Sequence, residues 1–104
     1  MKSLTSEEFN SEIQSFIPVL IEFWDVSCKI CAKAEIFMNK LEQAYKGKLF
    51  IAKINLADAL VLLDLYSVSK LPTFILFRSG RELTRSIGFR DEITLEKTIR
   101  EFIK

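Results

Sequence analysis

The chain has 104 residues, of which 49% are hydrophobic and 28% charged, so it can bury the core of one domain but leaves no room for two. Fifteen basic residues against fourteen acidic ones give a net charge of +1, which does not favour a nucleic-acid binder. Histidine is absent, which excludes Ser-His and Cys-His nucleophile pairs and imidazole metal ligands, so any redox or metal chemistry must depend on Cys28 and Cys31.

The first residues of the chain show no sign of export or membrane insertion. They are polar and lack the apolar segment of a signal peptide. The first apolar run, at residues 16–24, contains Pro18 and Glu22 and is far shorter than the ~20 residues of a membrane-spanning helix. We therefore expect a soluble, cytoplasmic protein that forms a single domain over residues 1–104.

Residues 6–16 are predicted to form the first helix. Thr5, with Glu8 three residues later, has the spacing of a capping box, which is typical of a helix N-terminus. Three apolar residues recur at helical spacing and are expected to be buried: Phe9, Ile13 and Phe16. The apolar run at residues 19–24 then predicts a largely buried strand.

The rest of the chain continues to alternate helices and strands. A second helix is expected from Cys28 to about Gly47, and a last helix after Asp91. Between them lie a strand at 49–54, a short helix at 58–66, and two strands at 73–78 and 82–87. This alternation is typical of an α/β fold, with parallel pairing in the first half and an antiparallel hairpin in the second.

Cys28 and Cys31 lie between the first predicted strand and the second helix. The free N–H groups and partial positive charge of a helix N-terminus stabilise a thiolate over a thiol. The pair is therefore suited to thiol–disulfide exchange, in which an exposed thiolate attacks a substrate disulfide and the second cysteine resolves the mixed disulfide. Three other interpretations remain open: a structural disulfide, half of a zinc or iron–sulfur site shared between two chains, and two incidental cysteines.

The segment from Phe23 to Cys31 resembles the active-site segment of the thioredoxin family. Leu71-Pro72-Thr73 and the strand that follows resemble the cis-proline loop and hairpin strand of that family, and Gly88 stands where the family has a glycine. The resemblance covers nearly the whole chain. It implies a thioredoxin fold of the α/β class, with a central mixed sheet of about four strands flanked by four helices and with the first strand short or absent.

The resemblance also implies roles for individual residues. Cys28 would attack and Cys31 would resolve. Pro72 would follow a cis peptide bond, and the backbone of Leu71 would pair with an extended substrate chain. The remaining residues expected to contact the substrate are Trp24, Lys29, Ile30 and Gly88.

Glu22 lies inside an apolar run, where burial of a bare carboxylate is costly. The family has a buried acidic residue there, near a lysine of the adjacent strand, and Lys53 matches that lysine. We therefore hypothesise that Glu22 has a raised pKa and accepts the proton of Cys31, through a water molecule, during resolution. The alternative is a Glu22 at a sheet edge with a solvated carboxylate.

Two features depart from the family pattern. Ser27 and Lys29-Ile30 replace its tryptophan and its Gly-Pro pair, and Lys29 adds a positive charge that favours the thiolate. The short helix at 58–66 is apolar nearly all round. Val61 and Leu65 would face outwards and form a surface for a partner or for self-association, unless the fold envelops this helix more fully.

The sequence therefore predicts a cytoplasmic protein-disulfide oxidoreductase of the thioredoxin class, without a dissociable cofactor or a metal ion. Its expected partners are disulfide-containing substrate proteins and an electron-donating reductase. Binding to nucleic acid or to a membrane is not expected. The expected oligomeric state is a monomer or a weak dimer. The alternative function is a redox-inactive binding module with the thioredoxin fold that uses the apolar third helix.

Overall fold

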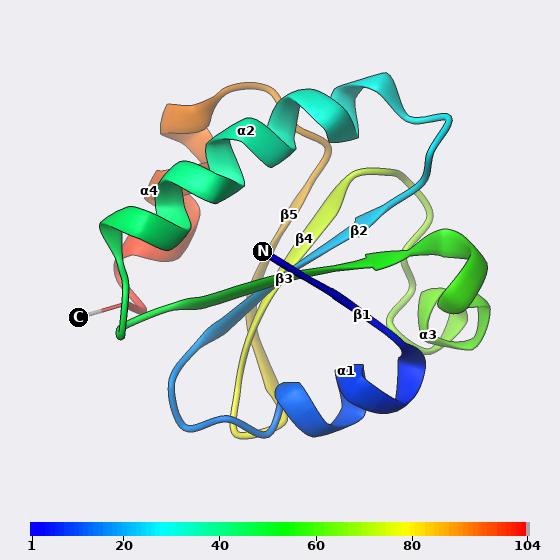
Figure 1. The fold of residues 1–104 in the computed structure, drawn as a ribbon, viewed down its shortest axis with the longest axis horizontal. Coiled ribbons are helices and arrows are strands. Elements are labelled where there is room, and N and C mark those ends of the chain that lie inside the picture. Colours follow the sequence, from blue (N-terminus) through cyan, green and yellow to red (C-terminus); the bar gives the residue numbers. More distant parts are fainter. Residues whose placement is uncertain (104) are drawn as a thin grey trace.

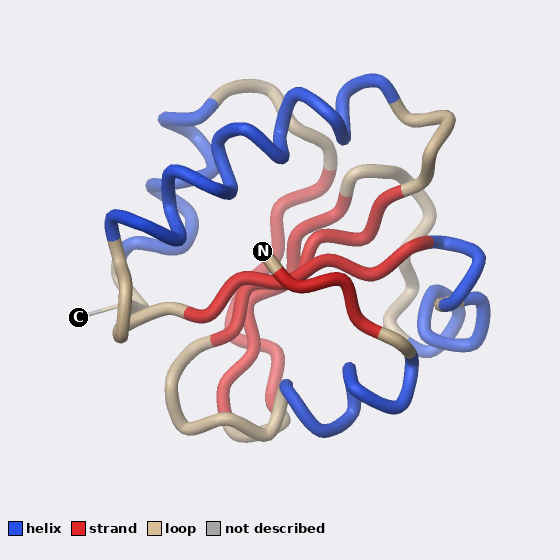
Figure 2. Tube along the Cα trace, viewed as in Figure 1, coloured by secondary structure: helices blue, strands red, loops and turns tan. Residues whose placement is uncertain are grey.

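A five-stranded mixed sheet forms the middle layer of the protein in the computed structural model, which describes residues 1–103 (Figure 1 and Figure 2). Its strands are β1 (Lys2–Leu4), β2 (Val19–Trp24), β3 (Phe50–Asn55), β4 (Thr73–Arg78) and β5 (Arg81–Ile87). They are arranged in the order β1-β3-β2-β4-β5. β3 is parallel to both of its neighbours, whereas β4 is antiparallel to β2 and to β5.

Four α-helices cover the two faces of the sheet: α1 (Ser6–Glu12), α2 (Lys29–Ala44), α3 (Leu60–Leu65) and α4 (Glu92–Arg100). A single 3-10 turn, η1 (Leu56–Asp58), precedes α3. α2 and α4 lie on one face and α1 and α3 on the other (Figure 1). The sheet is therefore buried on both faces, which explains why its central strands are nearly continuous apolar runs.

The predicted α/β architecture is confirmed, and the sheet has five strands where about four were expected. The additional strand, β1, pairs with residues 52–54 of β3. It has only three residues, too few to show the alternation of apolar and polar side chains that identifies a strand in a sequence. The first strand is thus short, as expected, but not absent.

The first helix is shorter than predicted, and Phe16 does not belong to the core. α1 ends at Glu12, and Phe16 is 84% exposed, so the prediction was wrong at this end of the helix. The carbonyl of Ile13 instead accepts a hydrogen bond from the N–H of Gly80, in the turn between β4 and β5, at 2.8 Å.

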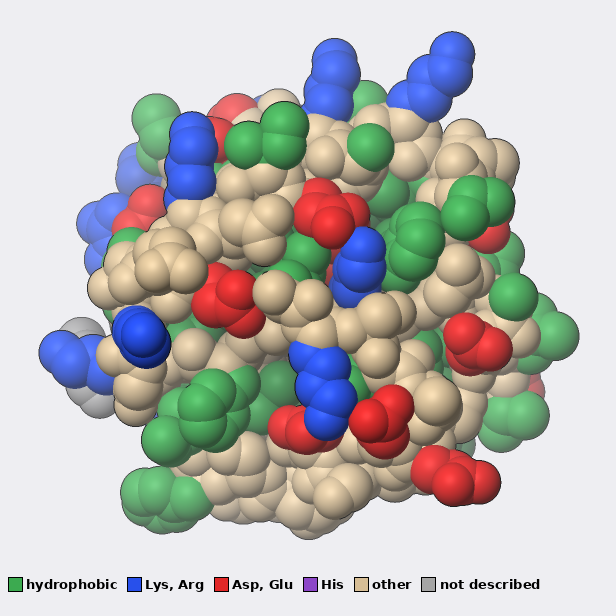
Figure 3. Space-filling view, in the orientation of Figure 1, with side chains coloured by type: hydrophobic (Ala, Val, Ile, Leu, Met, Phe, Trp, Pro, Cys, Tyr) green, Lys and Arg blue, Asp and Glu red, His purple; other side chains and the backbone are tan. Residues whose placement is uncertain are grey.

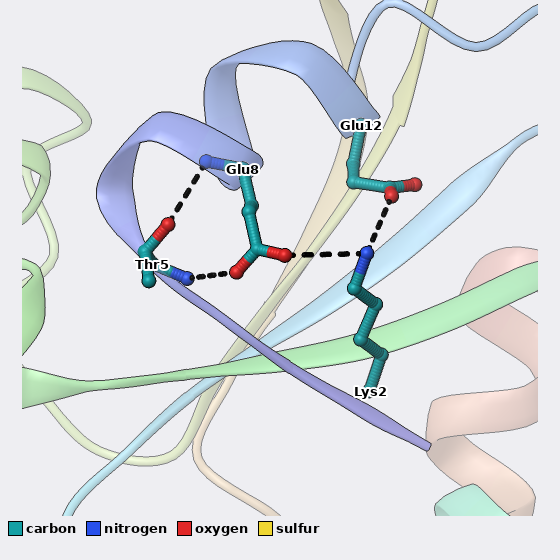
Figure 4. A network of polar contacts seen from close by, with 4 residues as sticks. All are labelled: Lys2, Thr5, Glu8 and Glu12. Atoms are coloured by element: carbon teal, nitrogen blue, oxygen red, sulfur yellow. Dashed lines mark hydrogen bonds and ion pairs between the residues drawn. The ribbon is translucent and has the colours of Figure 1, made fainter.

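The predicted capping box at the start of α1 is confirmed (Figure 4). Thr5 Oγ1 accepts a hydrogen bond from the backbone N–H of Glu8 at 3.1 Å, and Glu8 Oε1 accepts one from the N–H of Thr5 at 3.0 Å. Lys2 of β1 forms ion pairs with Glu8 and Glu12 at 3.4 and 3.2 Å. These contacts join the short edge strand to the helix that follows it.

The sheet separates two hydrophobic cores. The first lies beneath α1 and α3 and is centred on Phe9, whose ring centroid is 5.5 to 6.1 Å from those of three other rings: Phe23, Tyr66 and Phe77. The second lies beneath α2 and α4, and its largest fully buried side chains are Leu20, Met38, Leu49, Phe74, Leu76 and Leu95. Side chains alternate between the two faces along a strand, so β2 and β4 contribute to both cores.

Phe9→Ala is expected to lower the free energy of unfolding by ~3–5 kcal/mol, because it removes a fully buried ring and leaves a cavity. That loss is a large part of the ~5–15 kcal/mol by which small domains are stable. Urea unfolding of the oxidised protein measures it. The control is Phe16→Ala, which removes the same ring from an exposed position and should cost less than ~0.5 kcal/mol. Equal losses in the two variants would contradict this assignment of the core.

The surface carries acidic and basic side chains close together, and hydrophobic side chains gather at the edge over α3 (Figure 3). Val61 is 79% and Leu65 68% exposed, whereas Leu62 is buried, as the spacing predicted. The outward apolar face of α3 is therefore confirmed, and its use by a partner stays a prediction. Across residues 1–103, no helix has the length and apolar character needed to cross a membrane.

Candidate functional site

Cys28 and Cys31 lie at the N-terminus of α2, just after the end of β2. A disulfide joins them, with the two Cα atoms 5.3 Å apart. Cys28 is the N-cap residue of α2, and its Sγ accepts a hydrogen bond from the backbone N–H of Cys31 at 3.2 Å. After reduction, the same N–H and the positive end of the helix favour a thiolate on Cys28.

The two sulfur-bearing residues differ in accessibility. Cys28 is partly exposed, whereas Cys31 is only 2% exposed. The exposed residues Val26, Lys29 and Ile30 surround Cys28 in the chain and provide both apolar contact and one positive charge. A protein substrate can therefore reach Cys28, and Cys31 is placed to react with Cys28.

The Leu71–Pro72 peptide bond is cis, as the sequence predicted. The N–H of Gly88 donates a hydrogen bond to the carbonyl of Pro72 at 2.7 Å, which ties the end of β5 to the loop before β4. Pro72 is buried, whereas Leu71 is partly exposed. In the part of the chain that the structure describes, neither the N–H nor the C=O of Leu71 forms a hydrogen bond, so both can pair with an extended chain.

The strand register brings this loop and the cysteine segment to the same end of the sheet. Phe23, next to the end of β2, pairs with Thr73 at the start of β4, and Thr73 pairs with Ile87 at the end of β5. The loop before α2 and the loop before β4 lie at this end in Figure 1. Residues predicted from three separate segments of the sequence, the cysteine segment, the loop before β4 and the end of β5, thus gather at one end of the sheet.

Glu22 is buried inside β2 and is only 1% exposed, which excludes the solvated sheet-edge alternative. Its side chain lies on the face covered by α2, because Leu20 of the same strand belongs to the core beneath that helix. Neither carboxyl oxygen has a hydrogen-bond partner among the residues described. The pKa of Glu22 is raised to about 8, chiefly by burial and also by the nearby Glu35 carboxylate, while the Lys53 ammonium acts in the opposite direction.

Lys53 lies opposite Glu22 on the neighbouring strand, as predicted, but its ammonium group pairs with a different carboxylate. The register of β2 and β3 places Glu22 beside Lys53. Lys53 Nζ nevertheless donates to Glu35 Oε1 at 2.9 Å and lies 4.5 Å from the centroid of a Trp24 ring. Lys53 therefore forms an ion pair between β3 and α2, and gives no hydrogen bond to the carboxyl oxygens of Glu22.

Glu35 is the residue of this site that the sequence analysis missed. It follows Cys31 by four residues, so it lies one turn further along the same side of α2. Its neighbours in this part of the helix, Ala34 and Met38, are fully buried. A charged residue at the border of an apolar helix stripe is the signal that would have identified it.

Residues 1–101 match the family model of Thioredoxin. The chain belongs to this family. A thioredoxin of Chlamydia caviae is 34% identical over 101 residues, which cover 97% of this chain and 97% of that protein. A thioredoxin of Alicyclobacillus acidocaldarius subsp. acidocaldarius is 28% identical, over 98% of this chain and 97% of that protein. Thioredoxin M4, chloroplastic, of Arabidopsis thaliana is 31% identical, and the chain spans 53% of its length.

The predicted thioredoxin fold is confirmed by a solved structure that matches with a TM-score of 0.86 and 25% identity. The match covers 97% of this chain and 94% of the other, which comes from work on thiol resolution in a yeast mitochondrial 1-Cys peroxiredoxin via glutathione and thioredoxin systems. With its thioredoxin relatives and its close cysteine pair, the protein is a protein-disulfide oxidoreductase. The redox-inactive binding module is not favoured.

Proposed function

We propose that the protein reduces disulfides of other proteins, with Cys28 as the attacking and Cys31 as the resolving cysteine. The observation that carries this assignment is the unequal burial of the two residues, because only Cys28 is exposed to a macromolecular substrate. A reductase then returns two electrons to the disulfide. No dissociable cofactor is required, because the two thiols themselves hold these electrons.

The reaction proceeds in two exchange steps. In the first, the Cys28 thiolate forms a bond to one sulfur of the substrate disulfide, and the other substrate sulfur leaves as a thiolate. In the second, Cys31 gives its proton through a water molecule to the Glu22 carboxylate and attacks Cys28 Sγ, which expels the remaining substrate thiolate. The pKa of about 8 in the oxidised protein is near the ordinary pKa of a thiol, so a proton passes between Cys31 and the ionised form of Glu22 at little cost in free energy.

The substrate chain docks along the loop before β4. We infer that an extended segment pairs with the unbonded backbone groups of Leu71 by β-strand addition. Gly88 supports this loop through its hydrogen bond to Pro72, and its φ of +79° is a conformation that side-chain-bearing residues rarely adopt. The remaining contact surface is assigned to Trp24, Lys29 and Ile30.

The proposed location is the cytoplasm and the proposed state is a monomer or a weak dimer. The exposed Val61 and Leu65 on α3 provide an apolar face on which weak self-association can occur.

Insulin reduction by dithiothreitol, followed from pH 5.5 to 9, tests this mechanism. The unmodified protein should accelerate the reaction, and Cys28→Ser should return it to the rate of dithiothreitol alone. Glu22→Gln should slow the reaction at pH 7 by about 10²-fold and should remove the pH dependence that arises from the carboxyl group. An unchanged pH profile in Glu22→Gln would refute the proton role, and an inactive unmodified protein would refute the reductase assignment.

A further inference from the structure

Glu22 has a second carboxylate close to it, in a place where a buried acid needs positive charge in order to ionise. The neighbouring strand β3 contributes Lys53, and β4 contributes Phe74, which does not titrate. The helix above contributes Glu35, which lies one turn after the buried Cys31. The ammonium of Lys53 is therefore close to two carboxyl groups, those of Glu22 and Glu35. Whether it pairs with one or with the other determines the charge of Glu22.

In the oxidised protein the ammonium group of Lys53 forms an ion pair with the Glu35 carboxylate. The distance of 2.9 Å between Lys53 Nζ and Glu35 Oε1 is that of a charge-assisted hydrogen bond. The ring of Trp24 holds the same ammonium group from another side by a cation–π contact. An ammonium has three N–H donors, yet neither oxygen of Glu22 receives one, within the part of the chain that is described.

We propose that Glu35 is a positioning residue that sets the charge state of Glu22 by holding Lys53 away from it. This inference rests on the proposed function of Glu22 as the proton acceptor. While Lys53 stays on Glu35, Glu22 remains a neutral, protonated carboxyl group. When Glu22 releases its proton to water, the new carboxylate competes for the ammonium of Lys53, which then moves from one carboxylate to the other. The reduction cycle thus contains a lysine that alternates between two acids.

Two effects of Glu35 act in the same direction. Its negative charge disfavours a second negative charge on Glu22, and its hold on Lys53 withdraws the cation that would stabilise the Glu22 carboxylate. Glu35→Gln removes both effects and keeps the shape of a side chain that is 37% exposed, so the fold should be preserved. The pKa of Glu22 should therefore fall by about one pH unit in this variant.

The direct test is an NMR titration of the Glu22 side-chain carboxyl carbon in the oxidised protein. Glu35→Gln should move the midpoint to lower pH by about one unit. The matched control is Glu42→Gln, which removes another glutamate of α2 whose carboxylate also pairs with an ammonium, the amino terminus, at 3.0 Å. The control should leave the midpoint in place. A Glu22 midpoint that does not fall in Glu35→Gln, or that falls equally in both variants, would overturn the proposal.

A second comparison separates positioning of Lys53 from a simple charge effect. If Glu35 acts by holding the ammonium, Glu35→Gln should shift the Glu22 midpoint less in a Lys53→Met background than in the unmodified protein. An equal shift in both backgrounds would overturn the positioning role, because Glu35 would then act through its own charge alone.

Activity distinguishes this inference from the function on which it rests. In Glu35→Gln, the pH profile of insulin reduction should move to lower pH together with the carboxyl midpoint. A carboxyl midpoint that falls while the profile stays fixed, with Glu22→Gln also leaving the profile unchanged, would refute Glu22 as proton acceptor but keep Glu35 as its positioning residue. A profile that depends on Glu22 but not on Glu35 would refute only the positioning role.

Discussion

Cys31→Ser is expected to stop turnover and to leave the protein covalently attached to its substrate through Cys28. The first exchange step needs only Cys28, which is partly exposed at the N-terminus of α2. The second step needs the sulfur of Cys31 to expel the substrate, and a serine hydroxyl cannot form that bond. Insulin reduction should fall to the rate of the reductant alone, and non-reducing electrophoresis with mass spectrometry should show the mixed disulfide.

Cys28→Ser is the matched control for this experiment. It keeps Cys31, which is 2% exposed and therefore out of reach of a protein disulfide. This variant should be as inactive as Cys31→Ser but should form no adduct with the substrate. If it captured substrate as readily through Cys31, the assignment of the attacking and resolving residues would be wrong.

The oxidised protein is expected to lose stability as the pH rises from about 4.5 to about 8, because of Glu22. Burial holds its carboxyl group protonated in the folded state up to a pKa of about 8, whereas in the unfolded chain it ionises near 4.5. Between these values the unfolded state binds fewer protons, so the free energy of unfolding falls with rising pH. At ~1.4 kcal/mol for each pKa unit, the contribution lost over this window is roughly 4–5 kcal/mol.

Urea unfolding of the oxidised protein at pH 5 and at pH 8 measures this loss. Glu22→Gln carries no titrating group at this position and should lack the decline. Its stability relative to the unmodified protein should therefore increase between the two pH values. Parallel declines in the two proteins would show that Glu22 does not ionise with a raised pKa in the folded state.

Most elements of the fold could be predicted because each has a signal in its own residues. Thr5 and Glu8 mark the start of α1, and Asp91 marks the start of α4, where its carboxylate accepts a hydrogen bond from the N–H of Thr94 at 2.7 Å. The strand β4 has the predicted bounds. The errors lie where tertiary contacts determine the local structure. β1 is a strand only because it pairs with β3, and α1 ends before Phe16, where the carbonyl of Ile13 accepts a hydrogen bond from Gly80.

The candidate site was predictable in part for the same reason. The cysteine pair, the cis-proline loop and Gly88 stand in recognisable segments of sequence, and Glu22 is conspicuous as a charge within an apolar strand. The ion pair of Lys53 with Glu35 has no local signal, because its residues are 18 positions apart. It depends on how α2 lies across β3, which the pattern of a single sequence does not specify.

The division of the interior by the sheet has a consequence for engineering. The cluster around Phe9 lies on one side, and Glu22, Lys53 and Glu35 lie on the side beneath α2. Groups that share no partner and lie far apart respond independently to substitution. Substitutions that change the acidity of Glu22 on one side can therefore be combined with substitutions in the Phe9 core on the other, and their effects on the free energy of unfolding are expected to add.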